Sequence, residues 1–333
     1  MTVIIPVFNE ERWIGQTLRR LQTDAAQAPG LALDVVVVDD GSTDGTVRAV
    51  NEAAVALPCK VITQRNSGRL AARTRGLAEA VGDLVMFLDG RVMLDAGSLA
   101  FIEGRLRDDP DDAVWNAHVR IETDGNPYGR FWNVLTELVF SQYFDDPKTA
   151  YFDGSNFDAY PKGTTLFLVP RELAASTIGL HKSYYVDSRN AADDTPMIRD
   201  IAERHRIGIS PRFSCAYQPR AAFRPFVRHA YHRGIMFLDG HGRRGSRFLP
   251  VVAAFYPASA LLALVSARRP SVGFLALVAT AAGAGAVTIA KGRSPAETRA
   301  VAALGPVYAV AHGLGMWRGL LLATEARVKG RSS

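Results

Sequence analysis

The sequence predicts an α/β protein with an open, doubly wound sheet, followed by a membrane region. Two observations support this. Short apolar segments alternate with helical patterns in the first part of the chain, whereas residues 248–323 are apolar and almost free of acidic residues. With 333 residues, the chain is long enough to bury one large core and carry an appendage.

Four apolar segments predict the strands of the sheet. They are Val3–Val7, Asp34–Val38, Lys60–Gln64 and Leu84–Leu88, and helical patterns lie between them. The second segment is β-branched almost throughout, which is typical of a strand buried on both faces of a parallel sheet. The alternation of strands and helices predicts right-handed crossovers and an open sheet between helices.

The elements after this repeat are less regular. Phe101–Asp111 predicts a surface helix, and Ala113–Glu122 and Gly163–Arg171 predict strands. The segment Tyr128–Tyr143 is rich in aromatic residues and predicts a helix. We interpret its rings as core packing, with a position beside a bound ligand as the alternative.

Carboxylates follow two of the strands. Asp39 and Asp40 come directly after Val38, and Asp89 comes directly after Leu88. In open α/β sheets, ligands bind outside the carboxyl ends of the strands. The sequence therefore predicts a ligand site at this edge of the sheet.

Three segments carry a resemblance to a known family. Val3–Glu10, Val37–Thr46 and Asn66–Asp89 resemble, in order and spacing, the successive signatures of family-2 glycosyltransferases, which have the GT-A fold. The resemblance implies a Rossmann-like mixed sheet in a catalytic domain over residues 1–245, followed by membrane helices over residues 246–325. It also implies an inverting hexosyltransferase that uses a UDP- or GDP-linked sugar.

The resemblance assigns residues to the donor site. Asp40 would accept a hydrogen bond from the nucleotide base, with Pro6, Phe8 and Glu10 on the opposite wall of the slot. Arg73 would reach the nucleotide or the diphosphate. The alternative for Arg73 is a solvated helix face.

The chain departs from the family pattern at the expected metal site. The family usually places a second Asp two residues after the first, so that carboxylate oxygens hold a divalent cation on the diphosphate. Here Asp89 is followed by Gly90 and Arg91. We expect a remaining dependence on Mn²⁺ or Mg²⁺, held by Asp89 and other groups. Alternatively, Arg91 neutralises the phosphates directly.

An acidic pair later in the chain resembles the family's catalytic base. Asp193 and Asp194 close the loop Val186–Thr195 and precede a helical pattern. An inverting transfer to a hydroxyl needs a base on the face opposite the leaving diphosphate. Asp194 is the predicted base, with Asp193 beside it, and a plain helix cap is the alternative.

A basic segment follows. Residues 212–247 contain eight arginines and one acid, Asp239. Such a segment beside apolar ones suits a phosphate-bearing substrate or an anionic membrane surface better than nucleic acid. His232 and Arg233 are predicted to stabilise the leaving diphosphate, and Arg243, Arg244 and Arg247 to lie at lipid headgroups. A purely interfacial role for all of them is the alternative.

Three apolar segments end the chain. Phe248–Ala267 and Ser271–Ala290 each hold 20 residues without a charge, enough to cross about 30 Å of hydrocarbon. Ala300–Ala323 either spans the bilayer or lies in its interface. The residues that flank the far ends of the first two segments carry more Arg and Lys than the link Arg268–Pro270 between these segments. Since positive charge tends to stay on the cytoplasmic side, this predicts a multi-pass protein of the cell inner membrane with a cytoplasmic catalytic domain. An in-plane or re-entrant hairpin is the alternative.

These features together predict the substrates. The membrane segments favour a polyprenyl-phosphate-linked or cell-surface glycan acceptor, as in exopolysaccharide or cell-wall assembly. The layout resembles succinoglycan-type glycosyltransferases, and the absence of a Gln-x-x-Arg-Trp motif argues for transfer of a single sugar. The alternative function is a catalytically degenerate membrane scaffold for glycan assembly, which only Arg91 supports. A nucleotidyltransferase is disfavoured because no Gly-rich phosphate loop follows the first strand.

Overall fold

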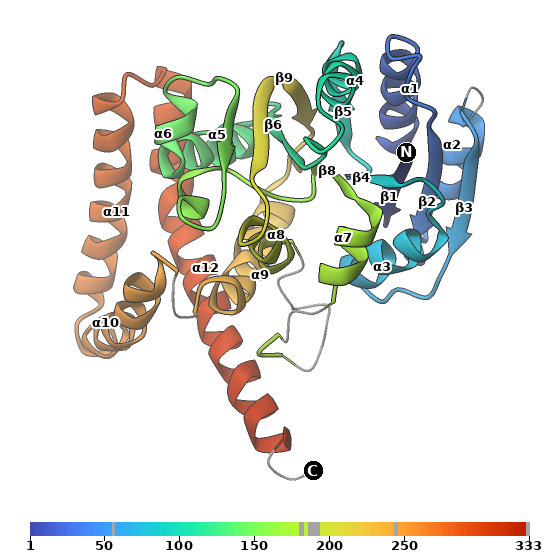
Figure 1. The fold of residues 1–333 in the computed structure, drawn as a ribbon. Helices are drawn as coiled ribbons and strands as arrows, with labels where there is room; N and C mark the ends of the chain where they lie inside the picture. Colours follow the sequence, from blue (N-terminus) through green and yellow to red (C-terminus); the bar gives the residue numbers. More distant parts are fainter. Residues whose placement is uncertain (55–56, 180–182, 186–193, 243–245, 331–333) are drawn as a thin grey trace. The chain divides into compact units, whose positions relative to one another are not determined.

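The computed structural model describes residues 1–54, 57–179, 183–185, 194–242 and 246–330. The chain divides into two compact units, which we describe separately. Figure 1 labels the helices and strands named below. The sheet unit comprises Met1–Arg120, Phe140–Lys182 and Asp193–Gln218. The helical unit comprises Ile121–Val139, Ser183–Ala192 and Pro219–Ser333.

The sheet unit is built on a mixed sheet, as predicted. Among the described residues the sheet has nine strands in the order β3-β2-β1-β4-β8-β6-β9-β5, and β7 pairs with β9. The parallel strands are β1 (Thr2–Val7), β2 (Asp34–Asp39), β3 (Cys59–Thr63) and β4 (Leu84–Leu88). The others are β5 (Val92–Leu94), β6 (Trp115–Ile121), β7 (Ala150–Phe152), β8 (Leu166–Pro170) and β9 (Ile207–Tyr217).

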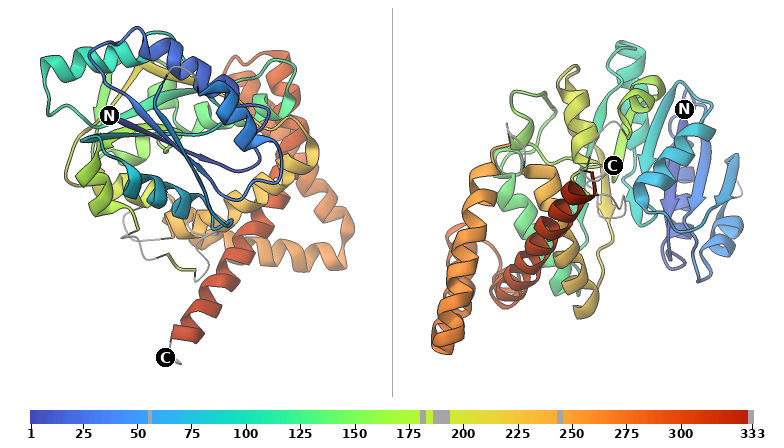
Figure 2. Two further views of the ribbon diagram at one scale, coloured as in Figure 1. Left: turned by 90° about the vertical axis from the view of Figure 1, so that its right-hand side faces the viewer. Right: turned by 90° about the horizontal axis from the view of Figure 1, so that it is seen from below.

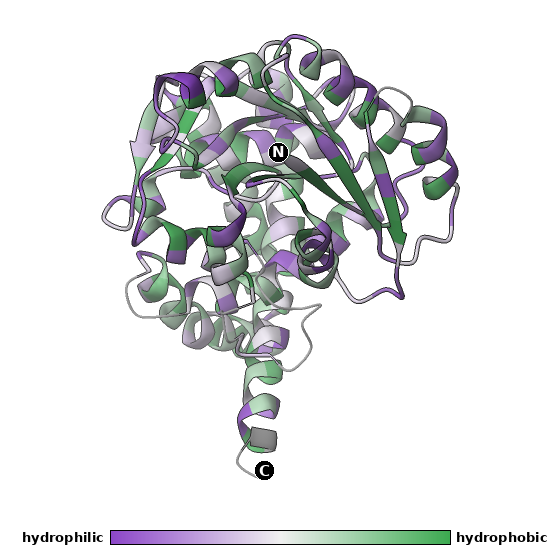
Figure 3. Cartoon of the chain, turned by 45° about the vertical axis from the view of Figure 1, so that its right-hand side comes forward, coloured by the Kyte–Doolittle hydropathy of each residue, from purple (hydrophilic) through white to green (hydrophobic). Residues whose placement is uncertain are grey.

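Helices cover both faces of the parallel strands (Figure 2). Side chains alternate along a strand, so Val3 and Ile5 pack into one core, whereas Ile4 between them packs into the other. The first core includes α1 (Ile14–Ala25), α2 (Thr46–Ala53) and α4 (Ser98–Asp108). The second includes α3 (Arg69–Glu79), α7 (Arg171–Thr177) and α8 (Thr195–Ala202). The central strands are apolar along most of their length, as the burial on both faces requires (Figure 3).

The sheet unit also contains two short helical segments, α6 (Ser141–Phe144) and η1 (Phe157–Ala159). The helical unit contains α5 (Pro127–Val139), α9 (Phe223–His241), α10 (Leu249–Arg268), α11 (Pro270–Ala290) and α12 (Pro295–Gly330). Phe131, Trp132 and Phe226 form a buried cluster between α5 and α9, to which α12 contributes Leu304. The rings of Phe131 and Trp132 are thus core packing, as interpreted from the sequence.

Glycines allow α9 and α12 to pack closely. A Cβ added at Gly234 of α9 would lie 2.1 Å from the His312 carbonyl oxygen of α12. One added at Gly315 of α12 would lie 2.0 Å from the Tyr231 carbonyl oxygen of α9. Both distances are far below van der Waals contact, so the helices can adopt this spacing only because these positions lack a side chain.

Within the described residues, three helices are long and apolar enough to cross a membrane, over residues Leu249–Arg268, Pro270–Ala290 and Pro295–Val328. They confirm the predicted apolar helices at the end of the chain. The first two are buried over 6% and 11% of their most apolar windows, and the third over 39%. Only the third therefore packs substantially within the protein.

Candidate functional site

The loops that follow β1 and β2 are joined at the carboxyl ends of these strands. Asn9 adopts a left-handed conformation with φ 55°, which Asn tolerates better than most residues. Its side-chain oxygen accepts a hydrogen bond from the Thr43 backbone N–H at 2.8 Å, and its own N–H donates to the Ser42 hydroxyl at 2.9 Å. The Glu10 N–H donates to the Thr46 hydroxyl at 2.8 Å. Backbone and side-chain hydrogen bonds therefore join the two loops at this edge of the sheet.

Asp44 belongs to the same junction. Its carboxylate accepts from the backbone N–H and hydroxyl of Thr46 and from the Glu11 N–H. Burial acts to raise the pKa of Asp44, but these hydrogen bonds outweigh it and hold the pKa below its ordinary value. The carboxylate is thus ionised in its role of joining the two loops.

Asp40 organises the segment that leads into α3. Its buried carboxylate accepts hydrogen bonds from the Gln64 side chain at 2.7 Å, the Ser67 N–H at 2.9 Å and the Gly68 N–H at 2.8 Å. A carboxylate offers about four acceptor positions, so one is left for a ligand. The predicted contact with a nucleotide base stays a prediction.

Arg73 and Asp89 meet at the end of β4. Arg73 projects from α3 with only 3% of its side chain exposed, and its guanidinium donates to the Asp89 carboxylate at 2.9 Å. A solvated helix face is therefore wrong for Arg73. Arg75, two residues further along the helix, is 54% exposed and pairs with Glu79.

Arg91 forms a second ion pair beside the first. Its Nε donates to Glu10 Oε1 at 3.0 Å, and its Nη2 donates to Oε1 at 2.5 Å and Oε2 at 2.6 Å. The two side chains are 11% and 12% exposed. Of the other residues expected at the slot, Pro6 is half-buried at the end of β1 and Phe8 is exposed just beyond it.

The residues present do not fit a carboxylate-held divalent cation. Within the part of the chain that the structure describes, no group of three or more His, Cys, Asp or Glu side chains is placed to hold a metal ion. The Asp89 carboxylate receives the Arg73 guanidinium, and Arg91, two residues later, offers only hydrogen-bond donors. One guanidinium group therefore pairs with Asp89, the expected metal ligand, and another occupies position 91, where the family pattern places its second Asp.

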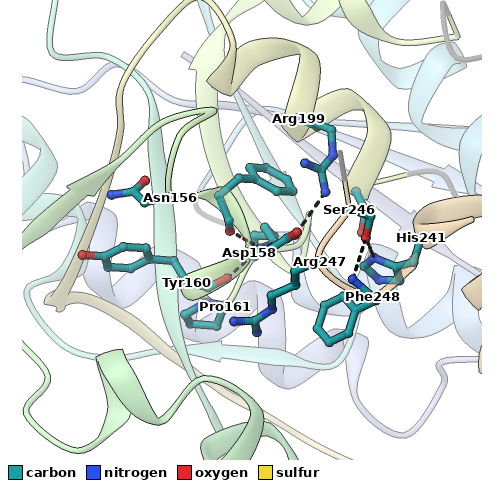
Figure 4. Close-up of polar contacts among 12 residues, drawn as sticks. Asn156, Asp158, Tyr160, Pro161, Arg199, His241, Ser246, Arg247 and Phe248 are labelled. Atoms are coloured by element: carbon teal, nitrogen blue, oxygen red, sulfur yellow. Dashed lines mark hydrogen bonds and ion pairs between the residues drawn. The ribbon is translucent and has the colours of Figure 1, made fainter. Parts of the chain in front are cut away.

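The acidic pair lies at the start of α8. Asp194 is the N-cap residue, and its carboxylate accepts from the Thr195 N–H at 2.6 Å. Asp193 lies outside the described residues. The cap is thus observed, and the role of Asp194 as base stays a prediction. One turn into α8, Arg199 donates to Asp158 at 3.0 Å, a contact that the sequence did not indicate (Figure 4).

The residues expected near the leaving group lie on α9, in the helical unit. Arg233 is exposed, with its guanidinium carbon 5.2 Å from the centre of the Trp132 ring, and His232 is half-buried. At the start of α10, the Ser246 hydroxyl lies within hydrogen-bonding distance of His241 Nδ1 at 3.4 Å (Figure 4). Arg243 and Arg244 lie outside the described residues.

Sequence comparison finds relatives over part of the chain. The chain is 34% identical over 128 residues to an undecaprenyl-phosphate 4-deoxy-4-formamido-L-arabinose transferase of Pseudomonas paraeruginosa, covering 34% of this chain and 38% of the relative. It is 39% identical over 93 residues to the transferase of the same name from Klebsiella pneumoniae, covering 27% and 28%. These matches cover 38% or less of the length of each relative.

Structure comparison shows the fold. The crystal structure of S. aureus TarS 1-349 in complex with UDP-GlcNAc has a TM-score of 0.51 and 18% identity, covering 72% of this chain and 66% of that chain. The complex of the same protein with UDP has a TM-score of 0.51 and 16% identity, covering 98% and 91%. The GT-A-like sheet followed by apolar helices is thus confirmed. The model of glycosyl transferase family 2 matches residues 2–168, half of the sequence, and the chain is therefore a member of that enzyme family.

Proposed function

We propose that this enzyme transfers one sugar from a nucleotide-sugar donor to a polyprenyl phosphate at the cytoplasmic face of a membrane. The observation that carries the proposal is the combination of a family-2 sheet unit with helices long and apolar enough to cross a membrane. A polyprenyl chain is itself held in a bilayer, so helices of this kind would bring the enzyme to its acceptor.

The names of the relatives support this acceptor class. Both relatives described above are named as undecaprenyl-phosphate transferases. The earlier resemblance to succinoglycan-type enzymes concerns only the layout of the chain. A polyprenyl phosphate itself is therefore the better-supported acceptor than a longer exopolysaccharide intermediate.

The proposed chemistry follows from the acceptor. An acceptor oxygen attacks the anomeric carbon from the face opposite the diphosphate, and the bond from that carbon to the diphosphate oxygen breaks. The second pKa of a phosphate monoester is about 6, so its oxygen is already ionised at neutral pH. A lipid phosphate therefore needs no base, whereas a hydroxyl would have to give its proton to Asp194. His232 and Arg233 would stabilise the departing diphosphate.

The test is a donor screen with the full-length protein in lipid nanodiscs. UDP- and GDP-linked sugars are supplied with undecaprenyl phosphate, and released UDP or GDP is measured. We expect one donor to release its nucleotide only when the lipid phosphate is present. A protein that neither binds nor consumes any donor would instead be the scaffold considered above.

A further inference from the structure

We propose that Arg91, held in position by Glu10, binds the donor diphosphate directly and makes a divalent cation unnecessary for donor binding. This inference rests on the proposed function, because the diphosphate belongs to the donor of that reaction. It concerns the one position at which the chain departs from its family's expected metal site.

The contact with Glu10 fixes the plane of the guanidinium. Both Glu10 oxygens accept from the edge of Arg91 formed by Nε and Nη2, at 2.5 to 3.0 Å. A two-point contact of this kind sets direction as well as position. Because the pair is nearly buried, at 11% and 12% exposure, solvent competes little with it.

The same contact leaves the opposite edge of Arg91 available. Guanidinium carries five N–H donors, and Glu10 uses only those on Nε and Nη2. No hydrogen bond to Nη1 is made by any residue that the structure describes. Nη1 therefore offers two N–H groups in a fixed plane, which suits a phosphate oxygen.

The backbone around Arg91 is equally constrained. The Arg91 carbonyl accepts from the Gln218 N–H at 3.1 Å, and the Val92 N–H donates to the Asp89 carbonyl at 3.2 Å. The buried Thr17 hydroxyl donates to the Gly90 carbonyl at 3.2 Å. A Cβ at Gly90 would lie 2.8 Å from Val7, so only glycine lets the turn approach β1 this closely.

The charges around the turn agree with a ligand that brings its own negative charge. Glu10 and Asp89 are each paired with an arginine, Arg91 and Arg73 respectively. A divalent cation entering between these pairs would meet two guanidinium groups and no second free carboxylate at position 91. A diphosphate would instead meet N–H donors.

The test is calorimetric titration of the full-length protein with UDP and GDP, in EDTA or in Mn²⁺. We expect one of these nucleotides to bind with a dissociation constant that the metal changes by less than about threefold. Tightening by about tenfold or more in Mn²⁺ would overturn the inference while leaving the proposed function intact. If neither nucleotide binds in either buffer, the proposed function fails, and this inference with it.

Variants locate the effect on the phosphates. Arg91→Ala should weaken UDP or GDP binding by about 10- to 100-fold, the usual contribution of a hydrogen bond to a charged group, and should weaken the corresponding nucleoside much less. Glu10→Gln keeps a neutral acceptor but loosens the guanidinium, so we expect a smaller loss in the same direction. Arg75→Ala, on the exposed face of α3, is the matched control and should bind as the unchanged protein does.

The charge reversal gives a second readout. Arg91→Asp restores a carboxylate two residues after Asp89, so its nucleotide binding should become dependent on Mn²⁺. Thermal unfolding shows whether Arg91→Ala folds. If it does not, the inference is tested by nucleotide binding to the unchanged protein in EDTA and in Mn²⁺, and by the affinity of the Glu10→Gln variant. Equal affinity of the unchanged and Glu10→Gln proteins for the diphosphate would count against a positioned Arg91.

Discussion

At the residue scale, Asp194 distinguishes the two classes of acceptor. Asn has the same shape and is as good an N-cap as Asp, so Asp194→Asn should preserve α8 while removing a base. With undecaprenyl phosphate as the acceptor, we expect the turnover rate to fall by less than about tenfold, because no proton has to be removed. Asp200→Asn, on the same helix, is the control.

The outcome that contradicts this expectation is a loss of about 10²–10⁴-fold in the variant, with unchanged thermal stability. Such a loss would show that transfer to undecaprenyl phosphate depends on the Asp194 carboxylate, against the expectation that this acceptor needs no base.

The sequence predicted site residues wherever position in a strand decides placement. Asp40 and Asp89 follow apolar strands, and the sheet brings the ends of these strands to one edge. It did not predict that Arg91 would pair with Glu10, because the two residues are 81 positions apart and no local pattern reports the contact. The burial of Arg73 was missed for the same reason, since it depends on Asp89 beneath it.

At the element scale, the contact between α9 and α12 makes a prediction about stability. Gly315→Leu places a side chain where the Tyr231 carbonyl lies, so the helices must separate. Overpacking of this kind costs about 1–3 kcal/mol or more, which should lower the thermal unfolding midpoint measurably. Gly283→Leu is the control, because a Cβ at Gly283 meets nothing within 4 Å. Equal midpoints for the two variants would show that α9 and α12 do not pack as described.

The parallel strands were predicted nearly to the residue, and β4 at both of its bounds. Three of them are nearly continuous apolar segments, and β3 carries the β-branched pair Val61 and Ile62, so the signal is local. The strands β5, β7 and β9 were not predicted. The first two are three residues long, and β9 contains Gly208 and Pro211, which are usually found outside strand interiors. Pairing with neighbours rather than propensity forms them.

At the scale of the whole molecule, the sequence placed one boundary, at residue 245, where the composition changes. The structure groups α5 and α9 with the C-terminal helices, although both precede that boundary. The reason is packing between distant segments, seen in the cluster of Phe131, Phe226 and Leu304. Composition reports where apolar helices begin, but it does not report which earlier helices they pack against.

The packing of α12 against α9 predicts on which side of the membrane the end of α12 lies. One side of α12 packs against α9, whose Arg224 and Arg228 are exposed, and charged groups of this kind are costly in hydrocarbon. We therefore expect α12 to lie along the bilayer surface while α10 and α11 cross and return. Two crossings return the chain to the compartment in which α9 lies. Green fluorescent protein fused after Ser333 should then fluoresce, and alkaline phosphatase fused there should be inactive. Phosphatase inserted after Arg269 should be active. Active phosphatase and non-fluorescent protein at Ser333, with phosphatase after Arg269 still active, would mean that α12 makes a third crossing.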